Sequence, residues 1–180
     1  GGMDQRKAHV LARDVAEKLH FKKPIAIHTP LLTGLQGSSR MDYLGEQPLI
    51  EAKMSKSKPE TAIFVHDSPE EIRAKILKAF CPPKVVDGNP IMEINKYILF
   101  SREDFNLTIN RPEKYGGTLL VNSYHELEKL YSTGKIHPLD LKNSTAEALI
   151  KYLSPIRKYF TENPEARRLL GELRGTYITR

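Results

Sequence analysis

The sequence has few of the residues on which several common kinds of site depend. It contains one cysteine, Cys81, so no disulfide can form within the chain, and this fits a reducing cytoplasm. Its six histidines are scattered, and none lies at ligand spacing from another histidine or from the cysteine. No apolar run approaches the length of a membrane span, and no signal segment opens the chain. We therefore expect a cytoplasmic protein with no metal held by its own side chains and no membrane partner.

Several catalytic signatures are also missing. The chain has no G-x-S-x-G motif, no Walker loop and no G-x-G-x-x-G, and Cys81 lies beside two prolines with no base near it in sequence. There is no internal repeat and no low-complexity segment. These absences argue against a hydrolase and against the common mononucleotide and dinucleotide folds that those loops mark.

The composition is that of a folded protein with a basic surface. Hydrophobic residues make up 39% of the 180 residues and charged residues 28%, which is typical of a soluble globular chain. Lysine and arginine number 28 against 22 aspartates and glutamates, a net charge of +6. This excess favours a polyanionic partner such as nucleic acid without establishing one.

The first third of the chain has an α/β pattern. Residues 4–21 show the apolar spacing of an amphipathic helix, and residues 24–28 resemble a short buried strand that ends at the Thr29-Pro30 turn. A helix followed by a strand indicates the end of a βαβ unit. Residues 33–60 are rich in Gly, Ser and Pro and lack apolar periodicity, so we expect a long loop there.

The rest of the chain reads as mostly helical. Ser68, Pro69 and Glu71 form a capping box with proline at the first helical position, which predicts a helix to about Phe80. Its Ile72, Ile76, Leu77 and Phe80 are expected to pack while Lys75 and Lys78 are exposed. The other expected elements are a helix over 89–100, short strands at 107–109 and 119–121 around Gly116-Gly117, a helix from the Ser123–Glu126 capping box to about Tyr131, a long helix from Pro138 that Pro155 should kink or break, and a last helix from Asn163-Pro164. We therefore expect two domains, residues 1–65 and 66–180.

One loop carries concentrated chemistry. Residues 53–57, Lys-Met-Ser-Lys-Ser, combine two ammonium groups with small hydroxyl residues. Lysine supplies a compact positive charge and serine a short hydrogen-bonding group, so such a loop suits a polyphosphate. The alternative is a solvated basic surface loop, and composition alone favours that alternative.

The order of several multi-residue blocks changes this balance. The blocks are GGMDQRK at 1–7, LTGL at 32–35, KMSKS at 53–57, SPEEIR at 68–73, RPEKYGG at 111–117 and HPLDLKN at 137–143. In this order they resemble the C-terminal half of the tyrosyl-tRNA synthetases of archaea and eukaryotes, which are class I aminoacyl-tRNA synthetases. The resemblance covers nearly the whole chain, implies that Gly1-Gly2 is native sequence, and implies the end of a Rossmann-type nucleotide-binding domain followed by a helical anticodon-binding domain.

The resemblance implies a tyrosine–tRNA ligase reaction. Tyrosine attacks the α-phosphate of ATP, and the tyrosyl group then passes to the 3′ end of tyrosine tRNA. Lys53 and Lys56 would stabilise the charge on the departing pyrophosphate, with Met54, Ser55 and Ser57 completing the ATP-binding loop. Mg²⁺ would accompany ATP, held largely by phosphate oxygens. Gln5 would contact the ammonium group of tyrosine; otherwise it reads as an exposed polar residue of a first helical turn.

Five further residues are implied to contact tRNA. Arg6 and Lys7 match residues that approach the first base pair of the acceptor stem, although such pairs are usually solvated helix charges. Tyr115, His137 and Asp140 match residues around the first anticodon base, a guanine, which can stack on rings and donate to a carboxylate. The alternatives are that Tyr115 packs beside a turn and that Asp140 complements the helix dipole.

Two features depart from the family. The upstream H-x-G-H motif of class I synthetases is not in this sequence, and the homodimer interface of the family also lies upstream, so we expect the isolated chain to be inactive. It would be a proteolytic product, a deliberately shortened protein or half of a split enzyme. Residues Ser38–Ala52 form an insert where most relatives have a few residues, either a small lid or a flexible segment. A tRNA-binding module without catalysis and a helical protein-interaction domain are the alternative functions.

Overall fold

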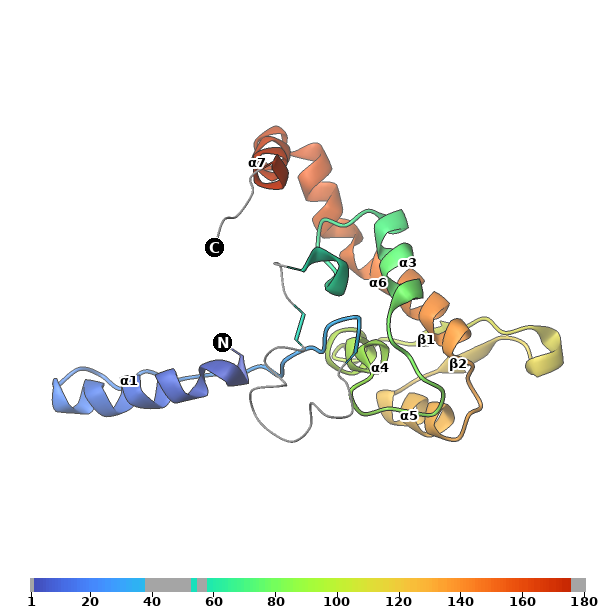
Figure 1. The fold of residues 1–180 in the computed structure, drawn as a ribbon, viewed down its shortest axis with the longest axis horizontal. Coiled ribbons are helices and arrows are strands. Elements are labelled where there is room, and N and C mark those ends of the chain that lie inside the picture. Colours follow the sequence, from blue (N-terminus) through green and yellow to red (C-terminus); the bar gives the residue numbers. More distant parts are fainter. Residues whose placement is uncertain (1, 38–52, 55–57, 176–180) are drawn as a thin grey trace.

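The computed structural model describes residues 2–37, 53–54 and 58–175 (Figure 1). A long helix, α6 (Pro138–Glu162), crosses the helical part, and α3 (Pro69–Lys78), α4 (Pro90–Ile94) and strand β1 (Leu107–Ile109) all contact it. Helix α1 (Arg6–Lys18) follows a 3₁₀ turn, η1 (Met3–Gln5), and projects away from the other helices in Figure 1. Among the helices of the described segments, none combines the length and apolar character needed to cross a membrane. The prediction that the chain is mostly helical after its first third is confirmed.

The strand predicted at residues 24–28 is wrong. Within the described part of the chain, no strand ladder includes this segment, and Ile25 and Ile27 are 90% and 76% exposed. A strand is stable only when a neighbouring strand satisfies its backbone groups, and a parallel bridge between Gly2 and Thr29, just after this segment, does not extend into a ladder among the described residues. The segment instead runs back along α1, where the ring nitrogens of His9 and His28 are 2.9 Å apart.

Helix α1 forms as predicted, but its apolar side is not covered by the described part of the chain. Val10, Leu11, Val15 and Leu19 are all exposed by 40% or more, and Ala16 is its one buried residue. The amphipathic spacing was therefore a correct guide to the helix and not to its burial here.

Helix α3 begins at the predicted capping box. The Ser68 hydroxyl accepts a hydrogen bond from the Glu71 amide at 3.1 Å, and the Glu71 carboxylate accepts one from the Ser68 amide at 2.7 Å. Ile72 and Ile76 are buried as predicted. The prediction was wrong for three other side chains: Leu77 and Phe80 are exposed, and Lys75 is largely buried because its ammonium binds the buried Asp67 carboxylate at 2.7 Å.

Helix α4 begins at Asn89, whose side-chain oxygen accepts from the amides of Ile91 and Met92. It continues into a π-helical turn, η4 (Asn95–Leu99), so the helix predicted over 89–100 is confirmed with a wider last turn. The buried Asn95 amide donates to Thr145 of α6 at 2.8 Å. This bond fixes the depth at which α4 and α6 pack.

The two predicted strands pair as an antiparallel hairpin. β1 and β2 (Leu119–Val121) are in the register Leu107↔Val121, Thr108↔Leu120 and Ile109↔Leu119. A 3₁₀ turn, η5 (Glu113–Tyr115), precedes Gly116 and Gly117, which have φ of 93° and 64°, a region that glycine adopts at little cost. Glycine at both positions therefore lets the chain reverse.

Helices α5 (Tyr124–Ser132) and α7 (Pro164–Gly175) begin at the predicted caps. Ser123 accepts from the Glu126 amide, but the Glu126 carboxylate binds the Asn122 amide, so this cap is a shifted version of the predicted box. Pro155 does not break α6, which remains helical for 25 residues around it. The lost hydrogen bond costs about 3 kcal/mol, and packing of buried Leu149 and Leu153 on the preceding turns offsets it.

One apolar core joins these elements. It contains residues of α3, α4, both strands, α5 and α6, and it also takes in Leu35 from the N-terminal third. The Leu35 amide donates to the Thr61 carbonyl at 2.8 Å, beside the 3₁₀ turn η3 (Pro59–Thr61), and its carbonyl accepts from the Phe80 amide at 2.6 Å. The segment before the lysine-rich loop is therefore attached to the helical core.

Candidate functional site

Lys53, the first residue of the lysine-rich loop, lies against the N-terminal turn. Its ammonium nitrogen is 2.6 Å from a carboxylate oxygen of Asp4, and the two side chains are 33% and 11% exposed. The hydrogen bond from Lys53 lowers the pKa of the Asp4 carboxyl below its usual value. The Asp4 carboxylate is therefore charged at neutral pH and accepts a hydrogen bond from Lys53.

Backbone contacts fix the position of Lys53. It forms an antiparallel bridge with Thr33, and the Met54 amide donates to the Leu32 carbonyl at 2.8 Å. Thr33 is held in turn by Glu93 of α4, whose carboxylate accepts from the Thr33 amide at 2.7 Å and from its hydroxyl at 2.8 Å. A continuous set of hydrogen bonds thus connects the helical core to the start of the loop.

Gln5 is next to Asp4 at the end of the turn η1. Its amide nitrogen is 3.5 Å from the Asp4 carboxylate, at the limit of hydrogen bonding. Arg6 and Lys7 follow in the first turn of α1, and both are exposed. The structure thus brings Lys53 to the turn that carries Gln5, and Arg6 and Lys7 continue from it along α1.

The remaining predicted residues of the loop, Ser55, Lys56 and Ser57, lie outside the described residues, as does the insert Ser38–Ala52. Their assignments stay predictions. Among the described residues, no group of three or more His, Cys, Asp or Glu side chains is arranged to hold a metal ion.

A second set of predicted residues lies at the β-hairpin turn and the start of α6. Tyr115 is 63% exposed, and the Lys114 ammonium lies 5.0 Å from the centre of its ring. The prediction that its ring is available to a ligand agrees with this exposure, whereas the alternative of a packed turn residue does not. An exposed phenol ring beside an ammonium group can stack on an aromatic base.

His137 is the N-cap of α6, and Asp140 lies in its first turn. The Leu139 amide donates to Nδ1 of His137 at 3.2 Å, so in the neutral ring the proton is on Nε2, which can donate outward. Asp140 is half-buried and sits where the helix dipole favours a negative charge. The dipole alternative for Asp140 therefore holds, and it does not conflict with binding a base.

Arg111 connects the hairpin turn to the start of α6. Its guanidinium donates to the carbonyl of Gly117 at 3.0 Å and to that of Lys135 at 3.1 Å. These bonds join the turn that carries Tyr115 to the segment that leads into His137. In Figure 1 this hairpin turn lies at one end of the molecule, far from η1 and α1, so the predicted residues form two separate sites.

Three structural residues of these sites were not assigned from the sequence. Asp4 is 49 residues from its partner Lys53, Glu93 is 60 residues from Thr33, and Arg111 is 24 residues from Lys135. No periodicity relates residues so far apart. Asp4 and Arg111 did lie within the quoted sequence blocks, which was the one available signal.

Comparison with known proteins finds a family that matches most of the chain. The family model described as tRNA synthetases class I (W and Y) matches residues 1–42 and 47–154. The tyrosine–tRNA ligase of Aeropyrum pernix is 57% identical over 178 residues, which cover 97% of this chain and 49% of the relative. That of Sulfolobus acidocaldarius is 53% identical, covering 100% of this chain and 50% of the relative.

Solved structures give the same result. The crystal structure of tyrosyl-tRNA synthetase from Aeropyrum pernix superposes with a TM-score of 0.81 at 52% identity, over 98% of this chain and 47% of that one. The Pyrococcus horikoshii enzyme, solved with L-tyrosine, gives a TM-score of 0.83 at 46% identity, over 95% and 50% of the two chains. This chain spans about half the length of the curated relatives it matches.

Proposed function

Because this chain belongs to the class I tRNA synthetase family of the tryptophan and tyrosine enzymes, we propose that it supplies the ATP-loop and anticodon-binding portion of a tyrosine–tRNA ligase. The observation that carries the proposal is the 2.6 Å pair between Lys53 and Asp4. It brings the KMSKS block to the DQRK block, as a shared active site requires. The relatives named above are tyrosine enzymes, which favours tyrosine over tryptophan as substrate.

In this proposal the lysines act on the leaving group. When the tyrosine carboxylate attacks the α-phosphate of ATP, negative charge builds up on the departing pyrophosphate. A lysine that exchanges its carboxylate partner for a phosphate oxygen stabilises this charge more in the transition state than in the ground state. Lys53 is one third exposed and at the edge of its site, so it can make that exchange. Lys56 would be the second cation, with Ser55 and Ser57 completing the loop.

The N-terminal residues would bind the amino acid and form part of its domain. Gln5, beside Asp4, would accept from the tyrosine ammonium group through its side-chain oxygen. Residues 1–65 would be the end of a Rossmann-type domain and residues 66–180 the anticodon-binding domain. Mg²⁺ belongs to the ATP substrate in this scheme and is held by phosphate oxygens. The complete enzyme would be a cytoplasmic homodimer.

The tRNA would contact both sites. The exposed Tyr115 ring and the imidazole of His137, the N-cap of α6, suit the two faces of an unpaired base. The Asp140 carboxylate suits the N–H edge of guanine. Arg6 and Lys7 would approach the acceptor stem. The separation of the two sites in Figure 1 is what contact with both the acceptor end and the anticodon of one tRNA requires.

Tyrosine-dependent ATP–pyrophosphate exchange tests the proposal. The chain should be assayed alone and after mixing with the part of the Aeropyrum pernix relative that it does not match. We expect exchange in the mixture and little in the chain alone. Lys53→Ala should lower exchange on the order of 100-fold, and Lys78→Ala, which removes an exposed lysine of α3, should leave it unchanged. Binding of tyrosine tRNA with no exchange in any combination would instead indicate a tRNA-binding module without catalysis.

A further inference from the structure

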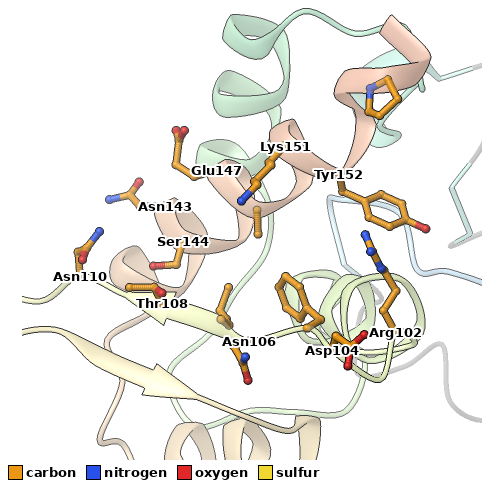
Figure 2. A pocket seen from close by; sticks show the side chains of 14 residues that line it. Arg102, Asp104, Asn106, Thr108, Asn110, Asn143, Ser144, Glu147, Lys151 and Tyr152 are labelled. Atoms are coloured by element: carbon orange, nitrogen blue, oxygen red, sulfur yellow. The ribbon is translucent and has the colours of Figure 1, made fainter.

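A groove lined by both apolar and polar side chains lies between β1 and α6, beside the hairpin site and separate from the residues predicted for it (Figure 2). Its volume is about 770 Å³. This is within the range of roughly 300–1,000 Å³ typical of sites for small molecules. The groove is therefore large enough to take at least one nucleotide.

The β1 side of the groove carries polar side chains because successive residues of the strand alternate between the core and the outside. Leu107 and Ile109 are buried in the core, so Asn106, Thr108 and Asn110 all face outward. Figure 2 shows these three side chains along one side of the groove. They present two amide groups and a hydroxyl group, each able to donate and accept hydrogen bonds.

The α6 side of the groove also carries a row of polar and charged side chains. Asn143, Glu147 and Lys151 recur every four residues and therefore lie on one face of α6. The Glu147 carboxylate is already bound by Arg73, with nitrogen–oxygen distances of 2.6 and 3.1 Å. Its charge is thus matched by a residue outside the groove, while Lys151 adds a positive charge to this side of the groove.

One end of the groove combines an aromatic ring with a cation. The Arg102 guanidinium carbon is 5.9 Å from the centre of the Tyr152 ring, and both residues are exposed. Asp104 is the one other carboxylate among the residues that line the groove. Aromatic rings beside Arg and Lys, set among amides and hydroxyls, are the side chains that bind unpaired nucleotides by stacking and phosphate contact.

The other end of the groove meets the hairpin site. Asp140 is three residues before Asn143 and seven before Glu147, so it lies on the same face of α6. On the strand side, Asn110 leads directly to Arg111 and the turn that carries Tyr115. In Figure 2, Asn110 and Asn143 are at one end and Arg102 and Tyr152 at the other. An RNA strand held at Asp140 would therefore continue along the groove.

We propose that this groove is a binding site for unpaired RNA and holds loop nucleotides next to the anticodon base at Asp140. Tyr152 would stack on a base, Lys151 and Arg102 would contact phosphates, and the asparagines and Thr108 would bind base edges or ribose hydroxyls. The proposal rests on the proposed function for the identity of the RNA, tyrosine tRNA. It adds a second contact area that would extend recognition beyond the first anticodon base.

Binding of an RNA hairpin to the full chain tests the proposal. The probe is the anticodon stem and loop of tyrosine tRNA, and binding is measured at several salt concentrations. Tyr152→Leu keeps apolar area without the stacking ring and should weaken binding about tenfold. Lys151→Gln should weaken binding and reduce the slope of log K against log[salt] by about 1. Lys129→Gln, which removes an exposed lysine of α5, is the matched control and should change neither.

A second set of RNA hairpins shows whether a base stacks on Tyr152. Loop nucleotides flanking the first anticodon base are replaced one at a time by abasic sites, and at one position the effect of Tyr152→Leu should disappear. If both groove variants bind within twofold of the wild type, or if Lys129→Gln weakens binding as much, the groove proposal is overturned while the proposed function stands. If the wild-type chain does not prefer this hairpin to an unrelated one, the anticodon assignment itself is overturned.

Discussion

The Lys53 ammonium and the Asp4 carboxylate are 2.6 Å apart, so the loop cation predicted to act on phosphate is bound to a protein anion. A phosphate ligand must compete with this carboxylate. Partly exposed ion pairs of this kind contribute about 1 kcal/mol or less. The pair therefore holds Lys53 in position without preventing its transfer to a ligand.

Asp4→Asn should accordingly strengthen the binding of inorganic pyrophosphate by about three- to fivefold, because it removes both the competing partner and a nearby negative charge. Lys53→Gln should weaken it. Calorimetric titration of the chain mixed with its missing portion measures both. Equal affinities for wild type and Asp4→Asn would mean that Lys53 does not take part in binding pyrophosphate.

Asp140→Ala should reduce aminoacylation of tRNA that has guanine as its first anticodon base. A carboxylate that accepts from the guanine N–H edge contributes about 1–3 kcal/mol of discrimination, which corresponds to roughly 5- to 150-fold in kcat/KM. ATP–pyrophosphate exchange should be unchanged, because the hairpin site is separate from Lys53. If the variant charged tRNAs with every first anticodon base as the wild type does, Asp140 would have a structural role only.

The parts of this fold that the sequence predicted are those set by neighbouring residues. The Ser68 cap and the glycines at 116 and 117 act within a few positions, so their local chemistry decides the structure. Local rules failed where distant packing prevailed: Pro155 stays within α6 because the turns before it pack in the core. The apolar run at residues 24–28 belongs to no strand ladder among the described residues, because a strand also depends on pairing with segments far away in the sequence. The Asp4–Lys53 contact required the folded chain, because no pattern relates residues 49 positions apart.

The Arg73–Glu147 pair should make a small, pH-dependent contribution to stability. It joins α3 to α6 with two hydrogen bonds, but the side chains are 49% and 60% exposed, so a double-mutant cycle should give only a small coupling energy. The hydrogen bond from Arg73 lowers the pKa of Glu147 below 4.5. The contribution is therefore complete above pH 4.5 and is lost as pH falls through the lower folded-state pKa. Urea unfolding at pH 7 and at a series of lower pH values measures it, and a coupling energy that does not fall as the Glu147 carboxylate is protonated would contradict this account.

Cys81 should be nearly unreactive in the folded chain. Burial raises the pKa of its thiol, and its sulfur lies 3.2 Å from the Tyr131 hydroxyl. A thiol reagent at pH 8 should label it slowly, with the rate rising sharply once urea unfolds the chain. Tyr131→Phe, which removes the 2.9 Å hydrogen bond to the Pro82 carbonyl, should destabilise the fold by about 1 kcal/mol. Fast labelling of native wild-type protein would show that the site opens without global unfolding.

Thr145→Val should cost more stability than its small change in shape indicates. Asn95 and Thr145 are both fully buried, and the Asn95 amide donates to the Thr145 hydroxyl at 2.8 Å between α4 and α6. Valine keeps the volume but leaves that N–H without an acceptor, which costs about 1–3 kcal/mol. Thr145→Ser keeps the hydroxyl and loses one methyl group, about 0.8 kcal/mol. Urea unfolding should therefore rank the stabilities as wild type, Ser and Val, in falling order. A valine variant as stable as the wild type would mean that apolar packing alone sets the contact between α4 and α6.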